Sequence, residues 1–259
     1  MNIKYLIISS VISLSTLSTI SCSKPLSPQN NNKSEPSKIY EQGSKYFLGK
    51  DVPKDYQKAF SYFEIAAEKG LPIAQNDLAG MYIKGIGTPK SEEKAYYWYE
   101  KAAKNGFPEA QYNVGLMYDN GYYLSKNRSK ALEFYKSAAH QGYAKAQYNL
   151  ANAYLSGNGV QKDINLALEL FKKAASQNLS EAQYNLANIY SDGSLVKQDN
   201  EKALELYTQV AEKGIPEAQN NLAYMYAHVY SDYEKAKFWF QKAADNGYEP
   251  AKEALEQFQ

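Results

Sequence analysis

Cysteine and histidine are almost absent from this sequence of 259 residues, which contains one cysteine, Cys22, and two histidines, His140 and His228. A single cysteine excludes an internal disulfide, so packing alone must hold the fold. The two histidines are far apart, and the His-Glu-x-x-His, Cys-x-x-Cys and Gly-x-Gly-x-x-Gly motifs do not occur. We therefore expect no metal, no cofactor and no catalytic residue.

An excess of charge is also missing, because 29 lysine and arginine residues balance 28 aspartate and glutamate residues. Such a chain has no strong field that would attract nucleic acid or an acidic partner. Tryptophan occurs only 2 times, whereas tyrosine occurs 25 times. The high tyrosine content follows from a repeat in the sequence.

A four-residue phrase recurs at a fixed interval along the chain. Ala-Gln-Tyr-Asn begins at Ala110, Ala146 and Ala182, each copy 36 residues after the last, and related phrases begin at Ala74 and Ala218. A fixed period of roughly 20 to 50 residues indicates a repeat protein, in which each unit packs only against its neighbours. Such a chain builds an extended surface, which favours binding over catalysis.

Six units fit this period, namely residues 38–73, 74–109, 110–145, 146–181, 182–217 and 218–250. Positions one, five and nine of each unit lie on one face of a first helix, and position nine is always tyrosine. Position six is always glycine or alanine, as close packing of helices requires. Each unit therefore begins with a helix that buries one face.

A second helix follows a loop that glycine usually opens. Position eighteen holds a residue type that caps helix N-termini: Asp55, Ser91, Asn127, Asp163, Asp199 and, after a shorter loop, Asp232. This helix ends at glycine or, in the fourth unit, at Asn178, as a left-handed cap requires. We expect an all-α fold of six helix–turn–helix repeats, closed by a capping helix over residues 251–259.

One repeat unit shows a resemblance to a known family. Residues 146–163, Ala-Gln-Tyr-Asn-Leu-Ala-Asn-Ala-Tyr-Leu-Ser-Gly-Asn-Gly-Val-Gln-Lys-Asp, and the following Lys-Lys-Ala-Ala-Ser-Gln are similar to the Sel-1-like repeat, a relative of the tetratricopeptide repeat. The resemblance covers residues 38–259. It implies a right-handed α-solenoid whose first helices line a concave groove and whose function is to bind other proteins.

The first 21 residues are expected to be a lipoprotein signal peptide. The basic start Met1–Lys4 precedes an apolar stretch, Tyr5–Ile20, which is too short and too rich in serine and threonine to span a membrane. Cys22 then follows small residues, as in a bacterial lipobox, although Thr19 stands where leucine is usual. We expect lipidation of Cys22, and an ordinary signal peptide is the alternative.

Residues 22–37 are expected to be the lipidated cysteine and a disordered tether, because proline, asparagine and serine dominate them. The predicted location is the bacterial cell envelope, on a membrane facing the periplasm or at the cell surface. Ser23, rather than aspartate, follows the cysteine, which in proteobacteria favours the outer over the inner membrane.

Positions three and seven of the first helices should point into the groove. The candidate partner-binding residues there are Tyr112, Tyr148, Asn152, Tyr184, Asn188 and Asn220. Tyrosine offers contact area at little entropic cost, and asparagine both donates and accepts hydrogen bonds. The expected partner is a protein or peptide, and a glycan strand is the alternative ligand. Packing of the same residues between adjacent helices is the alternative interpretation.

The sequence thus predicts a membrane-anchored adaptor, and two other functions stay open. One is a secreted hydrolase, because some Sel-1-like proteins carry a β-lactamase label and Ser-x-x-Lys occurs at Ser91–Lys94 and Ser194–Lys197. No Lys-Thr-Gly accompanies either serine, and Ser91 stands at a capping position. The other is a module that binds peptidoglycan of the cell wall.

Overall fold

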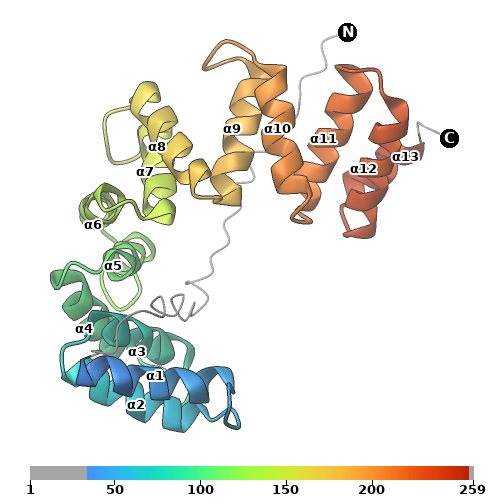
Figure 1. Cartoon of the computed structure of the whole chain (residues 1–259). Helices are drawn as coiled ribbons and strands as arrows, with labels where there is room; N and C mark the ends of the chain where they lie inside the picture. The colour runs from blue at the N-terminus through green and yellow to red at the C-terminus, as the bar shows by residue number, and fades with distance from the viewer. Residues whose placement is uncertain (1–33, 257–259) are drawn as a thin grey trace. The chain divides into compact units, whose positions relative to one another are not determined.

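The computed structural model describes residues 34–256, which form thirteen α-helices and no strand (Figure 1). These residues belong to two compact units, 34–146 and 147–256, and each is described by itself. The predictions for Cys22, for the signal peptide and for residues 22–33 of the tether lie outside the described residues. The all-α fold of paired helices with a closing helix is confirmed.

The helices follow one another as hairpins, and consecutive helices pack together from α1 to α6 in the first unit and from α8 to α13 in the second. The first unit contains α1 (Glu35–Leu48), α2 (Tyr56–Glu68), α3 (Pro72–Lys84), α4 (Glu92–Lys104), α5 (Pro108–Asn120), α6 (Arg128–His140) and the start of α7 (Ala144–Ser156). The second contains the rest of α7, then α8 (Ile164–Ser176), α9 (Ser180–Asp192), α10 (Asn200–Ala211), α11 (Pro216–His228), α12 (Tyr233–Asp245) and α13 (Glu249–Glu256).

The first helices begin earlier than predicted. From α3 to α11 they start two residues before the expected unit boundaries, at Pro72, Pro108, Ala144, Ser180 and Pro216. Proline is favoured at a helix start because the N–H that it lacks would have no partner there. Helix α1 begins at Glu35, so residues 35–37, predicted as the end of the tether, form its first turn.

The second helices begin where the capping residues predicted. In all six repeats the side-chain oxygen of the capping residue accepts a hydrogen bond from the backbone N–H three residues later, at 3.0–3.3 Å. A cap of this kind stabilises a helix by about 1 kcal/mol. The capping residues therefore set the register of every second helix.

Left-handed backbone ends the second helices, with φ of 86° at Gly142 and 62° at Asn178. A Cβ added at Gly142 would meet no atom within 4 Å, so only the backbone conformation would disfavour a side chain there.

We expect Gly142→Val to lower the free energy of unfolding by about 1–2 kcal/mol, because a β-branched residue disfavours positive φ. Asn178→Gly is the matched control and should be neutral or slightly stabilising. A Gly142→Val protein that melts with the wild type would show that φ is not positive there.

The core of each repeat is one aromatic ring beneath the small residue at position six. These rings are at most 3% exposed: Phe63, Tyr99, Tyr135, Phe171, Tyr207 and Phe240. The small residues are buried as well: Gly43, Ala79, Gly115, Ala151, Ala187 and Ala223. Together these two positions bring the paired helices into close contact.

The tyrosine at position nine is held by a lysine from the second helix of the same repeat. In five repeats the lysine nitrogen lies 5.2–5.4 Å from the ring centroid, in the pairs Lys58–Tyr46, Lys94–Tyr82, Lys130–Tyr118, Lys202–Tyr190 and Lys235–Tyr226. The fourth repeat has Leu166 where the others have lysine. Cation–π pairs of this kind contribute roughly 0.5–1 kcal/mol at an exposed site.

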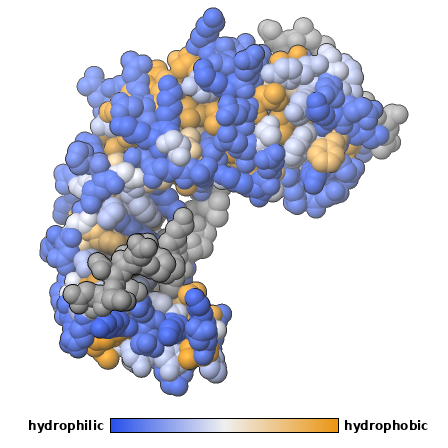
Figure 2. Space-filling model, viewed as in Figure 1, coloured by the Kyte–Doolittle hydropathy of each residue, from blue (hydrophilic) through white to orange (hydrophobic). Residues whose placement is uncertain are grey.

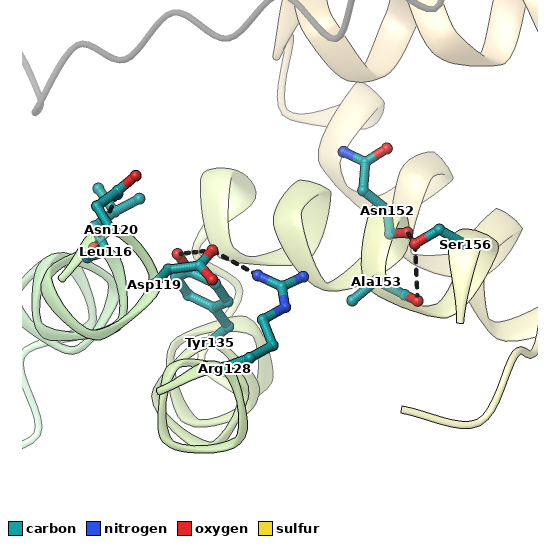
Figure 3. A network of polar contacts seen from close by, with 8 residues as sticks. All are labelled: Leu116, Asp119, Asn120, Arg128, Tyr135, Asn152, Ala153 and Ser156. Carbon is teal, nitrogen blue, oxygen red and sulfur yellow. Dashed lines mark hydrogen bonds and ion pairs between the residues drawn. The ribbon is translucent and has the colours of Figure 1, made fainter. Parts of the chain in front are cut away.

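The single arginine of the chain fixes one of the core rings. Arg128 forms an ion pair with Asp119, and the Tyr135 hydroxyl donates to the same carboxylate oxygen at 3.3 Å (Figure 3). Both charged side chains are about a quarter exposed, at 25% and 24%. The third repeat therefore has a polar link between α5 and α6 above its core.

Candidate functional site

The six predicted partner-binding residues lie on the first helices, Tyr112 on α5, Tyr148 and Asn152 on α7, Tyr184 and Asn188 on α9, and Asn220 on α11. Their exposure differs. Tyr112, Tyr184 and Asn220 are only 9%, 7% and 5% exposed, whereas the other three are half-buried. The half-buried residues all belong to α7 and α9, so the accessible part of the predicted site lies within the second unit.

The tyrosine rings of this site pack against the core rings of the second helices. Tyr148 lies with its ring centroid 5.8 Å from that of Phe171, and Tyr184 lies 6.0 Å from Tyr207, both edge to face. Such pairs stabilise a fold beyond the area that they bury. Both rings therefore contribute to packing, and their hydroxyl groups make polar contacts as well.

Those hydroxyl groups bond to the next repeat. The Asn185 amide nitrogen lies 3.5 Å from the Tyr148 hydroxyl oxygen, and the Asn221 amide nitrogen lies 3.1 Å from that of Tyr184. The first unit has the same spacing of 37 residues, since the Tyr40 hydroxyl donates to Asp77 at 2.7 Å. A row of polar contacts thus joins successive first helices.

The residues at position four, which the sequence pattern did not single out, supply the second half of each contact. Asn185 and Asn221 are half-buried, and both lie beside residues that were predicted from the sequence. Their signal was present, because this asparagine is the fourth letter of the repeated Ala-Gln-Tyr-Asn phrase. Positions three, four and seven together form the polar surface of α7, α9 and α11.

We call this surface the amide patch, and its residues are Tyr148, Asn152, Tyr184, Asn185, Asn188 and Asn221. The Asn188 Oδ1 atom accepts hydrogen bonds from the Tyr207 hydroxyl and from the Asn221 amide, at 3.3 Å for the latter. The Oδ1 atoms of Asn185 and Asn221 accept none from the described residues. An amide nitrogen carries two hydrogens, so Asn188 retains a donor even when it also approaches the Tyr184 hydroxyl. The patch keeps both donors and acceptors for a partner.

The hydroxyl groups of the patch are neutral at physiological pH. Burial raises the pKa of Tyr184 to about 12, and burial also raises the pKa of Tyr148. Glu181 and Glu217 are the carboxylates that add to these shifts. The patch is therefore an uncharged set of amides and hydroxyls with two acidic residues beside it.

Residues 34–256 were also compared with the expectations for a metal site and for the Ser-x-x-Lys serines. No three histidine, aspartate, glutamate or cysteine side chains there lie close enough together to hold a metal ion. The Ser91 hydroxyl, one of the two Ser-x-x-Lys serines, accepts the backbone N–H of Lys94 as the cap of α4. Across residues 34–256, none of the helices is both long and apolar enough to cross a bilayer.

Hydrophilic residues cover most of the face in Figure 2, with hydrophobic residues in separate groups among them.

Comparison with known proteins agrees with the repeat pattern. The Sel1 repeat model matches residues 40–71, 72–107, 108–143, 144–179, 180–215 and 216–248. From the second match on, the starts share the two-residue shift of the first helices. The chain is similar to a Sel1 repeat protein from Oxalobacter formigenes, with 33% identity and a TM-score of 0.78 over 88% of this chain and 66% of that one. No protein of the curated set matches significantly.

Two further solved structures are similar. One is a protective antigen of uropathogenic Escherichia coli, with 28% identity and a TM-score of 0.49 over 86% of this chain and 56% of that one. The other is an immunity protein from Pseudomonas aeruginosa, with 22% identity and a TM-score of 0.54 over 89% of each chain, a similarity of fold alone. The chain spans less than two thirds of the length of the Oxalobacter and Escherichia proteins.

Proposed function

The chain belongs to the Sel1 repeat family, and from this premise we propose that it is a non-catalytic scaffold that binds a protein or peptide at the amide patch. The observation that carries the proposal is the set of half-buried asparagines on α7, α9 and α11, whose amide groups are not all used within the fold. A buried polar group costs free energy when it lacks a partner, whereas a half-buried one can bond to water or to a ligand. Such groups are suited to reversible binding.

Crosslinking tests this proposal. A photoreactive amino acid is placed at position 188 in α9 or, as the matched control, at position 172 in α8, where the side chain of Lys172 is exposed. Both sites lie in the second unit, so the comparison is within one folded body. In the native host, position 188 should give one defined adduct that position 172 does not. Equal adducts from both positions, or a defined adduct from position 172 alone, would remove the amide patch as the binding site.

A second part of the proposal concerns the membrane. The lipobox-like residues before Cys22 support a lipid anchor on a bacterial envelope membrane, with the repeats facing the periplasm or the cell surface. Two or more acyl chains hold a protein stably on a bilayer, whereas one chain gives only marginal binding.

Replacing the cysteine tests the anchor. We expect Cys22→Ala to abolish incorporation of a fatty-acid analogue and to move the protein from the detergent phase to the aqueous phase, because no other cysteine is present to accept the lipid. Ser23→Ala is the control and should label and partition like the wild type. Labelling that persists in Cys22→Ala would rule out lipidation at this residue.

A further inference from the structure

The amide patch is repeated, and the repetition points to the shape of its ligand. Two groups of the same composition lie one repeat apart, namely Tyr148, Asn152 and Asn185, and Tyr184, Asn188 and Asn221. Each group joins a tyrosine hydroxyl to an asparagine of the next first helix. A surface that presents the same groups at a fixed interval suits a ligand that is itself periodic.

Each set of patch residues offers the donor and the acceptor that one peptide group needs. In the second group, Asn221 offers a free acceptor and Asn188 offers a donor, and a peptide group needs one of each. Packed helices lie about 8–10 Å apart, and an extended chain covers this distance in about three residues. An extended peptide could therefore bond to both groups through its main chain.

A glycan strand fits the same patch less well. Sugars are commonly held by the open face of an aromatic ring, and the two rings of the patch are packed against core rings of the second helices. Tyr184 is only 7% exposed, and the Tyr148 ring packs edge to face on Phe171. The available groups are amides and hydroxyls, which favour a peptide main chain.

The charge beside the patch indicates which side chains this peptide carries. On α9, Glu181, Asn185 and Asn188 are spaced i, i+4 and i+7, and so lie on one face of the helix. Glu217 and Asn221 share a face of α11 in the same way. Both glutamates are half-buried, and neither forms an ion pair among residues 34–256. Two unpaired carboxylates next to neutral amides complement lysine or arginine side chains.

We propose that the amide patch binds an extended polypeptide segment with basic side chains, whose main chain bonds to Asn185, Asn188 and Asn221 and whose cations meet Glu181 and Glu217. This inference rests on the proposed function and narrows it to one class of partner. Main-chain hydrogen bonds tolerate many sequences, whereas the two carboxylates select for positive charge.

Three synthetic peptides test the inference by fluorescence anisotropy with the full-length protein. The first is fluorescein-labelled Ser-Lys-Thr-Lys-Val-Lys-Thr-Lys-Ser. The second has glutamate in place of every lysine, and the third is the lysine peptide with alternate main-chain nitrogens methylated. We expect the lysine peptide to bind at least about tenfold more tightly than either of the others, because a tenfold change needs only about 1.4 kcal/mol.

Matched variants separate the two contributions. Glu181→Gln with Glu217→Gln should abolish the preference for lysine over glutamate. Glu169→Gln with Glu205→Gln makes the same charge change on α8 and α10 and should leave the preference intact. Asn188→Ala should weaken the lysine and glutamate peptides alike, and thermal melts identify any variant that has lost its fold.

Several results would overturn the inference. The first three are equal binding of the lysine and glutamate peptides, unchanged binding after methylation, and no binding of the lysine peptide. The fourth is displacement of the bound lysine peptide by soluble peptidoglycan strands that bind more tightly. A defined adduct from position 188 in the crosslinking experiment would still support the proposed function. Failure of the inference and failure of the proposed function are thus distinguishable.

Discussion

Gly115→Val should destabilise the first unit by about 3 kcal/mol or more, the largest loss that we expect from any single substitution. A Cβ at this position would lie 2.6 Å from Cε1 and 2.8 Å from Cδ1 of Tyr135, and 3.2 Å from the backbone oxygen of Ala131. The Tyr135 ring is fully buried and its hydroxyl bonds to Asp119 (Figure 3), so it cannot move aside without loss. Overpacking a rigid core typically costs about 1–3 kcal/mol, and valine adds two methyl groups beyond the Cβ.

Urea unfolding of the purified protein measures this effect, and two variants control for it. Gly115→Ala should cost less, because the fourth, fifth and sixth repeats accommodate alanine at the same position, at Ala151, Ala187 and Ala223. Gly142→Val adds the same side chain where the space is open, and so reports backbone strain alone. If Gly115→Val unfolds no more easily than Gly142→Val, the close contact between α5 and α6 is wrong.

Asp77→Asn should stabilise the protein by on the order of 2–3 kcal/mol at pH 8, the largest gain that we expect. Asp77 is 2% exposed, and burial raises its pKa to about 7 even though Tyr40 and Asn76 donate hydrogen bonds to it. The nearby Glu109 carboxylate raises the pKa further. Each unit of a pKa shift corresponds to about 1.4 kcal/mol, so a charge on Asp77 is costly.

Asparagine should fit this position well, because it is what the following four repeats have there: Asn113, Asn149, Asn185 and Asn221. An asparagine could donate to the Tyr40 hydroxyl as Asn221 donates to Tyr184. The substitution therefore removes a buried charge and keeps the contact between α1 and α3.

The pH dependence distinguishes this mechanism from better packing. The Asp77 carboxyl has a pKa of about 7 in the folded protein, against a usual 3.8, so between these values the folded state holds the proton more tightly than the unfolded state. Stability from this group therefore falls as pH rises from about 4 to about 7 and then levels off. Urea unfolding at pH 5, 6.5 and 8 should show the advantage of Asp77→Asn growing with pH. An advantage that is equal at all three values would mean that the charge is not its cause.

Local signals in the sequence predicted the helix pairs well. A capping residue at position eighteen bonds to a backbone N–H only three residues away, so its effect is contained in the sequence around it. The same holds for the left-handed ends at Gly142 and Asn178, because glycine and asparagine are the residue types that most readily adopt positive φ. The starts of the first helices were misplaced by two residues from α3 to α11 and by three at α1, and α13 also begins two residues early, because the repeated phrase begins inside the helix and not at its end.

The candidate site was harder to predict, because burial at positions three and seven depends on the neighbouring helices. The period places Tyr184 and Asn188 one turn apart on α9, yet the Tyr184 ring is covered by Tyr207 while Asn188 stays half-buried. Asn185 and Asn221 were overlooked because their role appears only when two repeats are stacked and a residue meets another that is 37 positions away. Sequence period thus identifies a helix face, whereas contacts between repeats decide which of its residues are free.

The amide patch is the surface that we propose holds the partner. Its most direct test is the affinity of the full-length protein for the partner captured at position 188, measured before and after Asn188→Ala. We expect at least about a tenfold loss of affinity with little change in melting temperature, because Asn188 is half-buried and supplies hydrogen bonds at the centre of the patch. An Asn188→Ala protein that melts like the wild type and binds the partner with unchanged affinity would contradict the claim.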